Sequence, residues 1–292
     1  MINKYTWLGF SSILIWACLV AVVKLITEQV APISGVALIY SFSALSILVF
    51  SGVPSVKSMP KKYLYGCGIL FICYEILFLI SVALSHNHEQ VLIIAMINYL
   101  WPPITIIFSI LAKQLNFKAW VFAGFILAVI GLLLVVNPKI IEFENFIHVL
   151  SQNPIAYAFA FLGALLWPCY GVFTKKYAEG ANAVPLFFVV TAFALWGVHF
   201  VSHEGFNMPS MGLWGAIAVT GSLIGWAYSN WNQSLQFGNI QLLILATYFM
   251  PVLSSIMSMF ILGVSPLITF WIGSALVTVG ALICWKSTSA IE

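Results

Sequence analysis

ILIWACLVAVVKLITE, residues 13 to 28, aligns without gaps to ALLWPCYGVFTKKYAE, residues 164 to 179. This alignment pairs Trp16 with Trp167, Cys18 with Cys169, Lys24 with Lys175 and Glu28 with Glu179. A second set of matches lies further along, pairing Tyr99 with Tyr248, Pro102 with Pro251, Gly124 with Gly273 and Gly131 with Gly280. Self-similarity at a fixed period indicates a duplicated structural unit. The sequence therefore predicts two copies of one unit, over residues 1–140 and 150–292.

The composition is that of an integral membrane protein. Hydrophobic residues make up 62% of the 292-residue chain and charged residues 7%, with a mean hydropathy of +1.07. Soluble domains carry about 25% charged residues, and a membrane-spanning helix needs about 20 apolar ones. Such stretches recur along nearly the whole chain. We predict ten spans: 5–24, 32–51, 63–84, 91–112, 117–137, 154–175, 184–203, 211–233, 239–262 and 266–286.

Each copy holds five of these spans. Because five is odd, equivalent helices must cross the membrane in opposite directions. Inverted repeats around a site at the bilayer midplane are typical of secondary transporters. We therefore expect an all-α integral membrane protein, with ten transmembrane helices arranged as two inverted five-helix repeats around a central cavity.

The lysines predict the orientation, since cytoplasmic loops carry the excess of positive charge. The chain has 11 lysines and no arginine. With the N-terminus inside, the cytoplasmic lysines are Lys4, Lys57, Lys61, Lys62, Lys113, Lys118, Lys175, Lys176 and Lys286. Only Lys24 and Lys139 fall outside, where Glu28, Glu89, Glu142, Glu144 and Glu204 also collect. This bias predicts that both termini are cytoplasmic.

The sequence offers little for an enzyme or for a bound cofactor. The five cysteines, Cys18, Cys67, Cys73, Cys169 and Cys284, lie inside predicted spans and lack metal-ligand spacing. No Walker A motif occurs, and the chain has no aspartate to serve as the phosphorylated residue of a pump. We expect no metal, no cofactor, no nucleic acid partner and no coupling to ATP. Paired carboxylates or a nucleophile beside a base are also missing from the spans, so we expect no enzyme activity.

NYLWPP, residues 98 to 103, places two prolines inside an uncharged span. Proline in a helix interior costs about 3 kcal/mol or more, and broken backbone is tolerated in a membrane only where it lines protein or water. TYFMP, residues 247 to 251, echoes this stretch in the second copy. The two stretches predict bent or bendable helices that face each other across the cavity.

Polar residues lie on one helical stripe in several spans, which predicts the cavity wall. The fourth, sixth, eighth and ninth spans carry polar stripes, the first carries a weaker one, and the fifth and tenth carry few polar residues. We therefore expect a cavity lined by the first, third, fourth, sixth, eighth and ninth spans, with the fifth and tenth at the periphery. Substrate-binding or gating candidates are Trp16, Asn98, Tyr99, Trp101, Pro102, Trp167, Tyr170, Tyr228, Asn230, Tyr248 and Pro251. Their aromatic rings suit a flat substrate by stacking or a cation by cation–π attraction. Packing in the helix bundle is the alternative for each.

Glu75 is the only acidic residue well inside a predicted span. A charge at the bilayer centre costs about 2.5 to 3.5 kcal/mol on insertion scales, so such a group is a functional candidate. It can carry a proton, recognise the ammonium group of a substrate, or join two helices as a hydrogen-bonded acid. His86 and His88 fall at the outer mouth, as solvated loop residues or as part of a gate, and His199 is expected to be packed or interfacial.

Several of these stretches resemble a known family. IYSFS (39–43), YEI (74–76), INYLWPPIT (97–105), WPCYG (167–171), KKYA (175–178) and YFMPVLSS (248–255) are similar to the EamA-like, ten-helix drug/metabolite transporter superfamily, and most to its bacterial YddG-type aromatic amino acid exporters. The resemblance covers nearly the full chain. It implies export of aromatic amino acids across the bacterial inner membrane, with Tyr99, Trp101, Pro102, Trp167, Tyr248 and Pro251 at the cavity or gate. Pro103 departs from the expected single proline, which bears on the local bend.

The leading hypothesis is a secondary-active or gradient-driven exporter of phenylalanine, tyrosine and tryptophan, and of related flat metabolites, that works by alternating access. A broad-specificity exporter of aromatic or cationic toxic compounds is the alternative, as is an uptake system. An intramembrane enzyme or assembly factor belongs to a different class, which catalytic turnover would reveal. Gly221-x-x-x-Gly225 marks a close helix approach within one chain or between chains, and we expect a monomer in the lipid bilayer.

Overall fold

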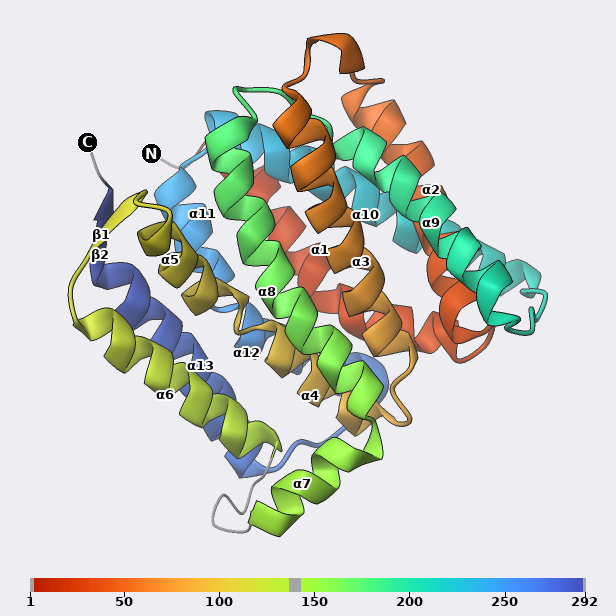
Figure 1. The fold of residues 1–292 in the computed structure, drawn as a ribbon. Helices are drawn as coiled ribbons and strands as arrows, with labels where there is room; N and C mark the ends of the chain where they lie inside the picture. The colour runs from red at the N-terminus through yellow and green to blue at the C-terminus, as the bar shows by residue number, and fades with distance from the viewer. Residues whose placement is uncertain (1–2, 137–142, 291–292) are drawn as a thin grey trace.

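The computed structural model describes residues 3–136 and 143–290, most of which are helical (Figure 1). The first half contains α1 (Lys4–Thr27), α2 (Pro32–Ser51), η1 (Val56–Ser58), η2 (Lys62–Cys67), α3 (Gly68–Ala83), α4 (His88–Asn98), α5 (Trp101–Leu111), β1 (Leu115–Phe117) and α6 (Trp120–Val136). The second half contains α7 (Phe143–Gln152), α8 (Pro154–Tyr177), α9 (Val184–Ser202), α10 (Met211–Phe237), α11 (Ile240–Thr247), α12 (Met250–Leu262), α13 (Ile268–Lys286) and β2 (Thr288–Ala290).

The helices agree closely with the hydropathy pattern. Each predicted span coincides within a few residues with one helix or with two consecutive helices. Within the described part of the chain, eight helical segments are long and apolar enough to cross a membrane. Two further apolar helices, Trp120–Val135 and Met250–Leu262, are shorter. The protein is therefore a multi-pass helical membrane protein. Lys139 and Glu142, which entered the orientation argument, lie outside the described residues.

The fourth and ninth predicted spans are both broken at the tyrosine that the repeat alignment pairs. The break between α4 and α5 falls at Tyr99 and Leu100, and the break between α11 and α12 falls at Tyr248 and Phe249. The prolines stand in the first turn after each break. Backbone N–H groups in a first helical turn have no intrahelical acceptor, so proline loses nothing there. The breaks therefore explain how NYLWPP and TYFMP fit into apolar helices.

The main helix contacts join the two halves of the chain. α6 packs along α13, α1 and α2 pack along α10, α2 also packs along α9, and α3 packs along α8. Glycines make the closest approaches possible. A Cβ added to Gly221 on α10 would lie 2.5 Å from the carbonyl oxygen of Ile39, and one on Gly225 would lie 2.7 Å from that of Ser43. The GxxxG motif therefore joins α10 to α2 within one chain.

Two smaller elements also connect distant parts of the sequence. β1 pairs with β2 in antiparallel register, with Leu115 opposite Ala290, at the end of the molecule where both termini lie (Figure 1).

Glu204, in the loop after α9, accepts hydrogen bonds from the backbone N–H groups of Ile33 at 3.0 Å and Ser34 at 2.9 Å. The acid thus caps the N-terminus of α2 from the other half of the chain.

Candidate functional site

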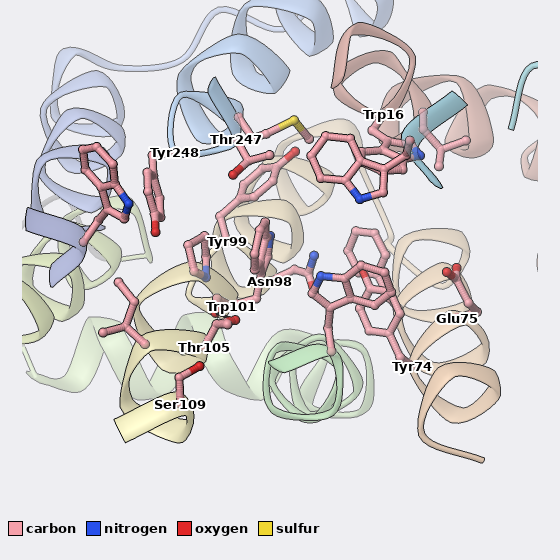
Figure 2. Close-up of a pocket in the computed structure, with 18 of the residues that line it drawn as sticks. Trp16, Tyr74, Glu75, Asn98, Tyr99, Trp101, Thr105, Ser109, Thr247 and Tyr248 are labelled. Carbon is pink, nitrogen blue, oxygen red and sulfur yellow. Dashed lines mark hydrogen bonds between the residues drawn. The ribbon is translucent and has the colours of Figure 1, made fainter. Parts of the chain in front are cut away.

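A cavity of about 750 Å³ lies between the two halves (Figure 2). Its walls come from α1, α3, α4, α5, α8 and α10 and from the break between α11 and α12. These helices correspond to the six spans that were expected to line the cavity, and the ends of β1, α13 and β2 add residues at its mouth. The volume falls in the range of small-molecule sites, about 300–1,000 Å³. The lining residues are Trp16, Leu19, Val20, Tyr74, Glu75, Phe78, Leu79, Asn98, Tyr99, Trp101, Pro102, Thr105, Ile106, Ser109, Leu115, Trp167, Lys175, Tyr228, Trp231, Thr247, Tyr248, Met250, Trp285, Lys286 and Thr288.

Glu75 on α3 is buried at one side of this cavity, opposite Tyr248 (Figure 2). Two tyrosine hydroxyls donate hydrogen bonds to its carboxylate: Tyr40 on α2, and Tyr228 on α10 at 2.6 Å. No lysine or histidine among residues 3–136 and 143–290 forms an ion pair with it. The carboxylate is therefore held by neutral donors, and its negative charge is not neutralised by a protein cation.

Aromatic rings form most of the wall near Glu75. Trp16 meets Tyr228 and Trp231 edge to face, with ring centroids 5.1 and 5.2 Å apart. Across the cavity, Tyr74 and Trp167 lie 4.7 Å apart. Ring pairs at these separations attract each other and present broad apolar faces with polar edges. The wall suits a flat ring or a cation held against ring faces.

Two polar atoms in the same region are buried without a hydrogen-bond partner among the described residues. They are the indole Nε1 of Trp16, a donor, and the side-chain oxygen Oδ1 of Asn98, an acceptor. Asn98 is the last residue of α4, directly before the break. Buried polar groups are normally paired, so this part of the cavity wall holds one unmet donor and one unmet acceptor.

The other end of the cavity is polar and open. Thr105 and Ser109 on α5 lead from the tryptophan wall towards the helix ends (Figure 2). The exposed lysines Lys175, on α8, and Lys286, on α13, line the mouth together with Thr288. We call this the open end of the molecule. The opposite end, where α1 meets the turn between α3 and α4, contributes no lining residue and is called the closed end.

Nine of the candidates from the sequence line the cavity, and five do not. The nine are Trp16, Glu75, Asn98, Tyr99, Trp101, Pro102, Trp167, Tyr228 and Tyr248. Tyr170 lies behind Trp167 and packs against Phe71, and Pro251 is buried in the first turn of α12. Asn230 is buried on α10, where its backbone carbonyl accepts from Ser234. His86 and His88 lie at the closed end, outside the cavity.

The serine stripe of α12 also points elsewhere than expected. Ser254, Ser255 and Ser258 are buried among the helices that pack on α12, chiefly α1, and none lines the cavity. Ser255 donates to the carbonyl of Pro251 on its own helix. Small side chains permit close approach of membrane helices, so this stripe is a packing surface. Conversely, α13 was expected at the periphery, yet its last turn supplies Trp285 and Lys286 to the open end.

Tyr40, the second donor to Glu75, is not among the candidates from the sequence. An isolated tyrosine in an apolar span carries no signal of its partner, and only the packing of α2 beside α3 reveals it. Trp231, Met250 and Trp285 are further lining residues outside the candidate set. Among the described residues, no group of three histidine, cysteine or acidic side chains is placed to hold a metal ion.

Comparison with known proteins identifies relatives along the full chain. Residues 154–285 match the EamA-like transporter family. The protein named aromatic amino acid exporter YddG from Escherichia coli (strain K12) is 32% identical over 290 residues, covering 98% of each chain. The protein of the same name from Salmonella typhimurium (strain 14028s / SGSC 2262) is 32% identical over 288 residues, again covering 98% of each chain. A more distant protein of that name, from Ancylobacter novellus, is 23% identical over 288 residues and covers 96% of each chain.

The fold has a counterpart among solved structures. A crystal structure, described only as that of a protein, superposes with a TM-score of 0.70 at 22% sequence identity, covering 98% of this chain and 99% of the other. That likeness concerns the fold alone. The sequence relationships, at 32% identity over nearly the whole length, concern the family. The chain belongs to the EamA-like transporter family.

Proposed function

We propose that this protein exports aromatic amino acids from the bacterial cytoplasm through the central cavity, by alternating access. The single observation that carries the proposal is the pairing of an aromatic wall with one unneutralised buried carboxylate, Glu75. An aromatic amino acid offers a ring for the wall and an ammonium group for the carboxylate. The relatives named aromatic amino acid exporters support the same assignment.

The arrangement suggests one orientation for the substrate. The ammonium group lies towards Glu75 and the acceptor Oδ1 of Asn98, and the carboxylate lies towards the Nε1 donor of Trp16. The side-chain ring then lies among Tyr74, Trp101 and Trp167. Each polar group of the amino acid meets a partner of opposite hydrogen-bonding character, which is how a site rejects analogues that lack one of these groups.

We further propose that the chain crosses the membrane ten times as two inverted repeats, with both termini in the cytoplasm. The contacts of α6 with α13 support twofold symmetry. Gly124 faces Gly280 and Gly131 faces Gly273, and exchanging each glycine for its counterpart in the repeat alignment converts one contact into the other. The lysines of the loops, concentrated at the end where the termini lie, favour placing the open end in the cytoplasm. The cavity is then open inward.

Flux measurements in liposomes test the substrate and its coupling. Purified protein is reconstituted, and uptake of labelled phenylalanine, tyrosine and tryptophan is followed with and without a pH gradient. Saturable flux of at least one of them is expected. Flux no greater than in protein-free liposomes would refute the substrate assignment, and a rate that ignores the gradient would refute proton exchange in favour of transport down the substrate gradient.

Replacement of the carboxylate separates its two proposed roles. If Glu75 carries a proton, Glu75→Gln retains substrate binding and loses the dependence of flux on pH. If Glu75 recognises the ammonium group, the same variant weakens affinity by about tenfold or more, as expected for a hydrogen bond to a charged group. Glu89→Gln, an exposed acid at the start of α4, is the matched control and should change neither property.

Export of aromatic or cationic toxic compounds is the second candidate function. The absence of a protein cation beside Glu75 among the described residues favours it, because the site then accepts organic cations as readily as amino acids. A resistance panel in cells producing the protein distinguishes the two. Protection against cationic dyes without export of amino acids would support the toxin exporter.

A further inference from the structure

A cluster of charged side chains around the buried Lys24 closes the end of the molecule opposite the cavity mouth. Lys24 lies in the last turn of α1 with only 4% of its surface exposed. Its ammonium group donates a hydrogen bond to the backbone carbonyl of Ser85, in the turn between α3 and α4. The same group lies 3.4 Å from a carboxylate oxygen of Glu28. A buried lysine is tolerated only when it is paired in this way.

Glu28 extends the cluster to two more helices. Its carboxylate lies 3.2 Å from Nε2 of His88, the first residue of α4. Nδ1 of His88 lies 2.9 Å from the backbone carbonyl of Leu262, at the end of α12. Because a carbonyl oxygen only accepts, Nδ1 is the donor. The cluster thus ties α1 to α4 and to α12, which belong to different halves of the chain.

The repeat alignment pairs these residues with a second lysine and glutamate. Lys24 corresponds to Lys175 and Glu28 to Glu179, near the end of α8. Both glutamates are exposed, but the lysines differ, because Lys24 is buried whereas Lys175 is exposed and lines the cavity mouth. No ion pair joins them within the part of the chain that the structure describes. The same lysine–glutamate motif is therefore engaged at the closed end and disengaged at the open end.

We propose that Lys24–Glu28 and Lys175–Glu179 are two gate pairs that engage in turn as the cavity opens to one side and then to the other. When the open end closes, Lys175 loses its contact with water, pairs with Glu179 and donates to a carbonyl of the turn between α10 and α11. That turn corresponds in the repeat to the turn that contains Ser85. The inference rests on the proposed alternating access between inverted repeats and adds the residues that hold each state.

The two pairs act on one equilibrium. A group that is stabilised in only one conformation shifts the population towards that conformation. Removing Glu28 leaves the buried Lys24 ammonium without its carboxylate, and removing Lys24 deletes the hydrogen bond that ties α1 to the turn between α3 and α4. Either change favours the conformation in which this end is open to water. The cavity mouth should then close in the same molecules, because a transporter that alternates does not open both ends.

Hydrogen exchange of backbone amides, followed by mass spectrometry on the purified full-length protein without substrate, tests the proposal. Lys24→Met is expected to raise exchange about tenfold in residues 84–91 and 262–267, which surround the closed end, since local opening controls exchange. It should lower exchange in residues 112–118 and 178–183 at the mouth. Glu28→Gln, an isosteric change that leaves the buried Lys24 without its carboxylate, should shift both regions in the same directions. Glu89→Gln, an exposed acid at the same end, is the control and should shift neither.

The second gate pair has its own variant. Adding Glu179→Gln to Lys24→Met weakens the conformation that Lys24→Met favours, so exchange at the closed end should fall back towards that of the unaltered protein. A rise at the closed end without a fall at the mouth would overturn the proposal, because it describes local fraying only. The absence of any fall-back in the double variant would overturn the role of Lys175 and Glu179. Since no substrate is present, failure of the amino acid flux assay leaves this result standing.

Discussion

Gly124 on α6 lies backbone against backbone with Gly280 on α13. A Cβ atom added to Gly124 would lie 2.6 Å from the carbonyl oxygen of Gly280, and one added to Gly280 would lie 2.5 Å from that of Gly124. Gly131 and Gly273 meet in the same way about two helical turns further along. The two helices therefore form a tight unit beside the cavity, which any larger residue at these four positions would separate.

Gly124→Ala should lower the thermal unfolding midpoint of the detergent-purified protein by about 5 °C, since overpacking costs about 1–3 kcal/mol. The backbone carbonyl that the new methyl group meets cannot rotate away as a side chain would. Gly171→Ala is the control, because no atom lies within 4 Å of its added Cβ. Intrinsic tryptophan fluorescence during heating reports both midpoints. Equal midpoints for the two variants would show that the close contact between α6 and α13 contributes nothing to stability.

Trp101→Ala should weaken binding of tryptophan about tenfold, because one aromatic contact and its buried area are worth about 1.4 kcal/mol. Titration calorimetry on the purified protein measures the change in Kd. Trp120→Ala removes a tryptophan that is 69% exposed on the outer face of α6 and should leave Kd unchanged. An unaltered Kd in Trp101→Ala would place the substrate ring elsewhere in the cavity.

Tyr40→Phe should reduce amino acid flux about tenfold, as expected when a charged acceptor loses one hydrogen bond. Tyr40 does not line the cavity, so its effect must pass through the Glu75 carboxylate that it orients. In a Glu75→Gln background the same substitution should add little, which a double-mutant cycle on the flux measures. Tyr65→Phe, whose ring is 64% exposed, serves as the neutral comparison. Independent, additive losses would separate Tyr40 from Glu75.

Reporter fusions at the C-terminus should confirm the orientation in cells. Lysine-rich loops are retained in the cytoplasm, so a green fluorescent protein fusion should fluoresce and an alkaline phosphatase fusion should be inactive. Fusions truncated after residue 207, in the loop between α9 and α10, should give the reverse pattern. The opposite pair of results would invert the membrane topology and place the open end of the cavity outside.

Hydropathy and proline placement predicted much of the fold because both act locally. Apolar length defines each span before any tertiary contact forms, and the prolines of NYLWPP and TYFMP mark the positions where α4 and α11 end. α7 is the element that hydropathy does not predict, since its ten residues, Phe143–Gln152, are too few and too mixed in polarity to span a bilayer. Its place before α8 emerges only from the structure.

A site residue could be predicted where its type is rare in an apolar span, as for a carboxylate. It could not be predicted where the same residue type serves both a cavity wall and a helix contact. Glu75 was identified because a carboxylate in an apolar span needs a reason. Serines on α12 formed an equally regular stripe, yet a small hydroxyl serves a watery cavity and a close helix contact alike. Ser254 is therefore buried between helices, while Thr247, the last residue before the break, lines the cavity. The rotation of each helix about its own axis decides which of its polar residues face the cavity. That rotation depends on packing against helices that are far apart in the sequence.

The capping of α2 by Glu204 has a consequence for how the protein is made. The backbone N–H groups of Ile33 and Ser34 receive their carboxylate from a residue translated about 170 positions later. During synthesis, α2 therefore has no side-chain cap from Glu204 until α9 and the loop after it have been made. The first half of the chain therefore cannot complete the N-terminus of its own second helix, and its last contact there comes from the second half.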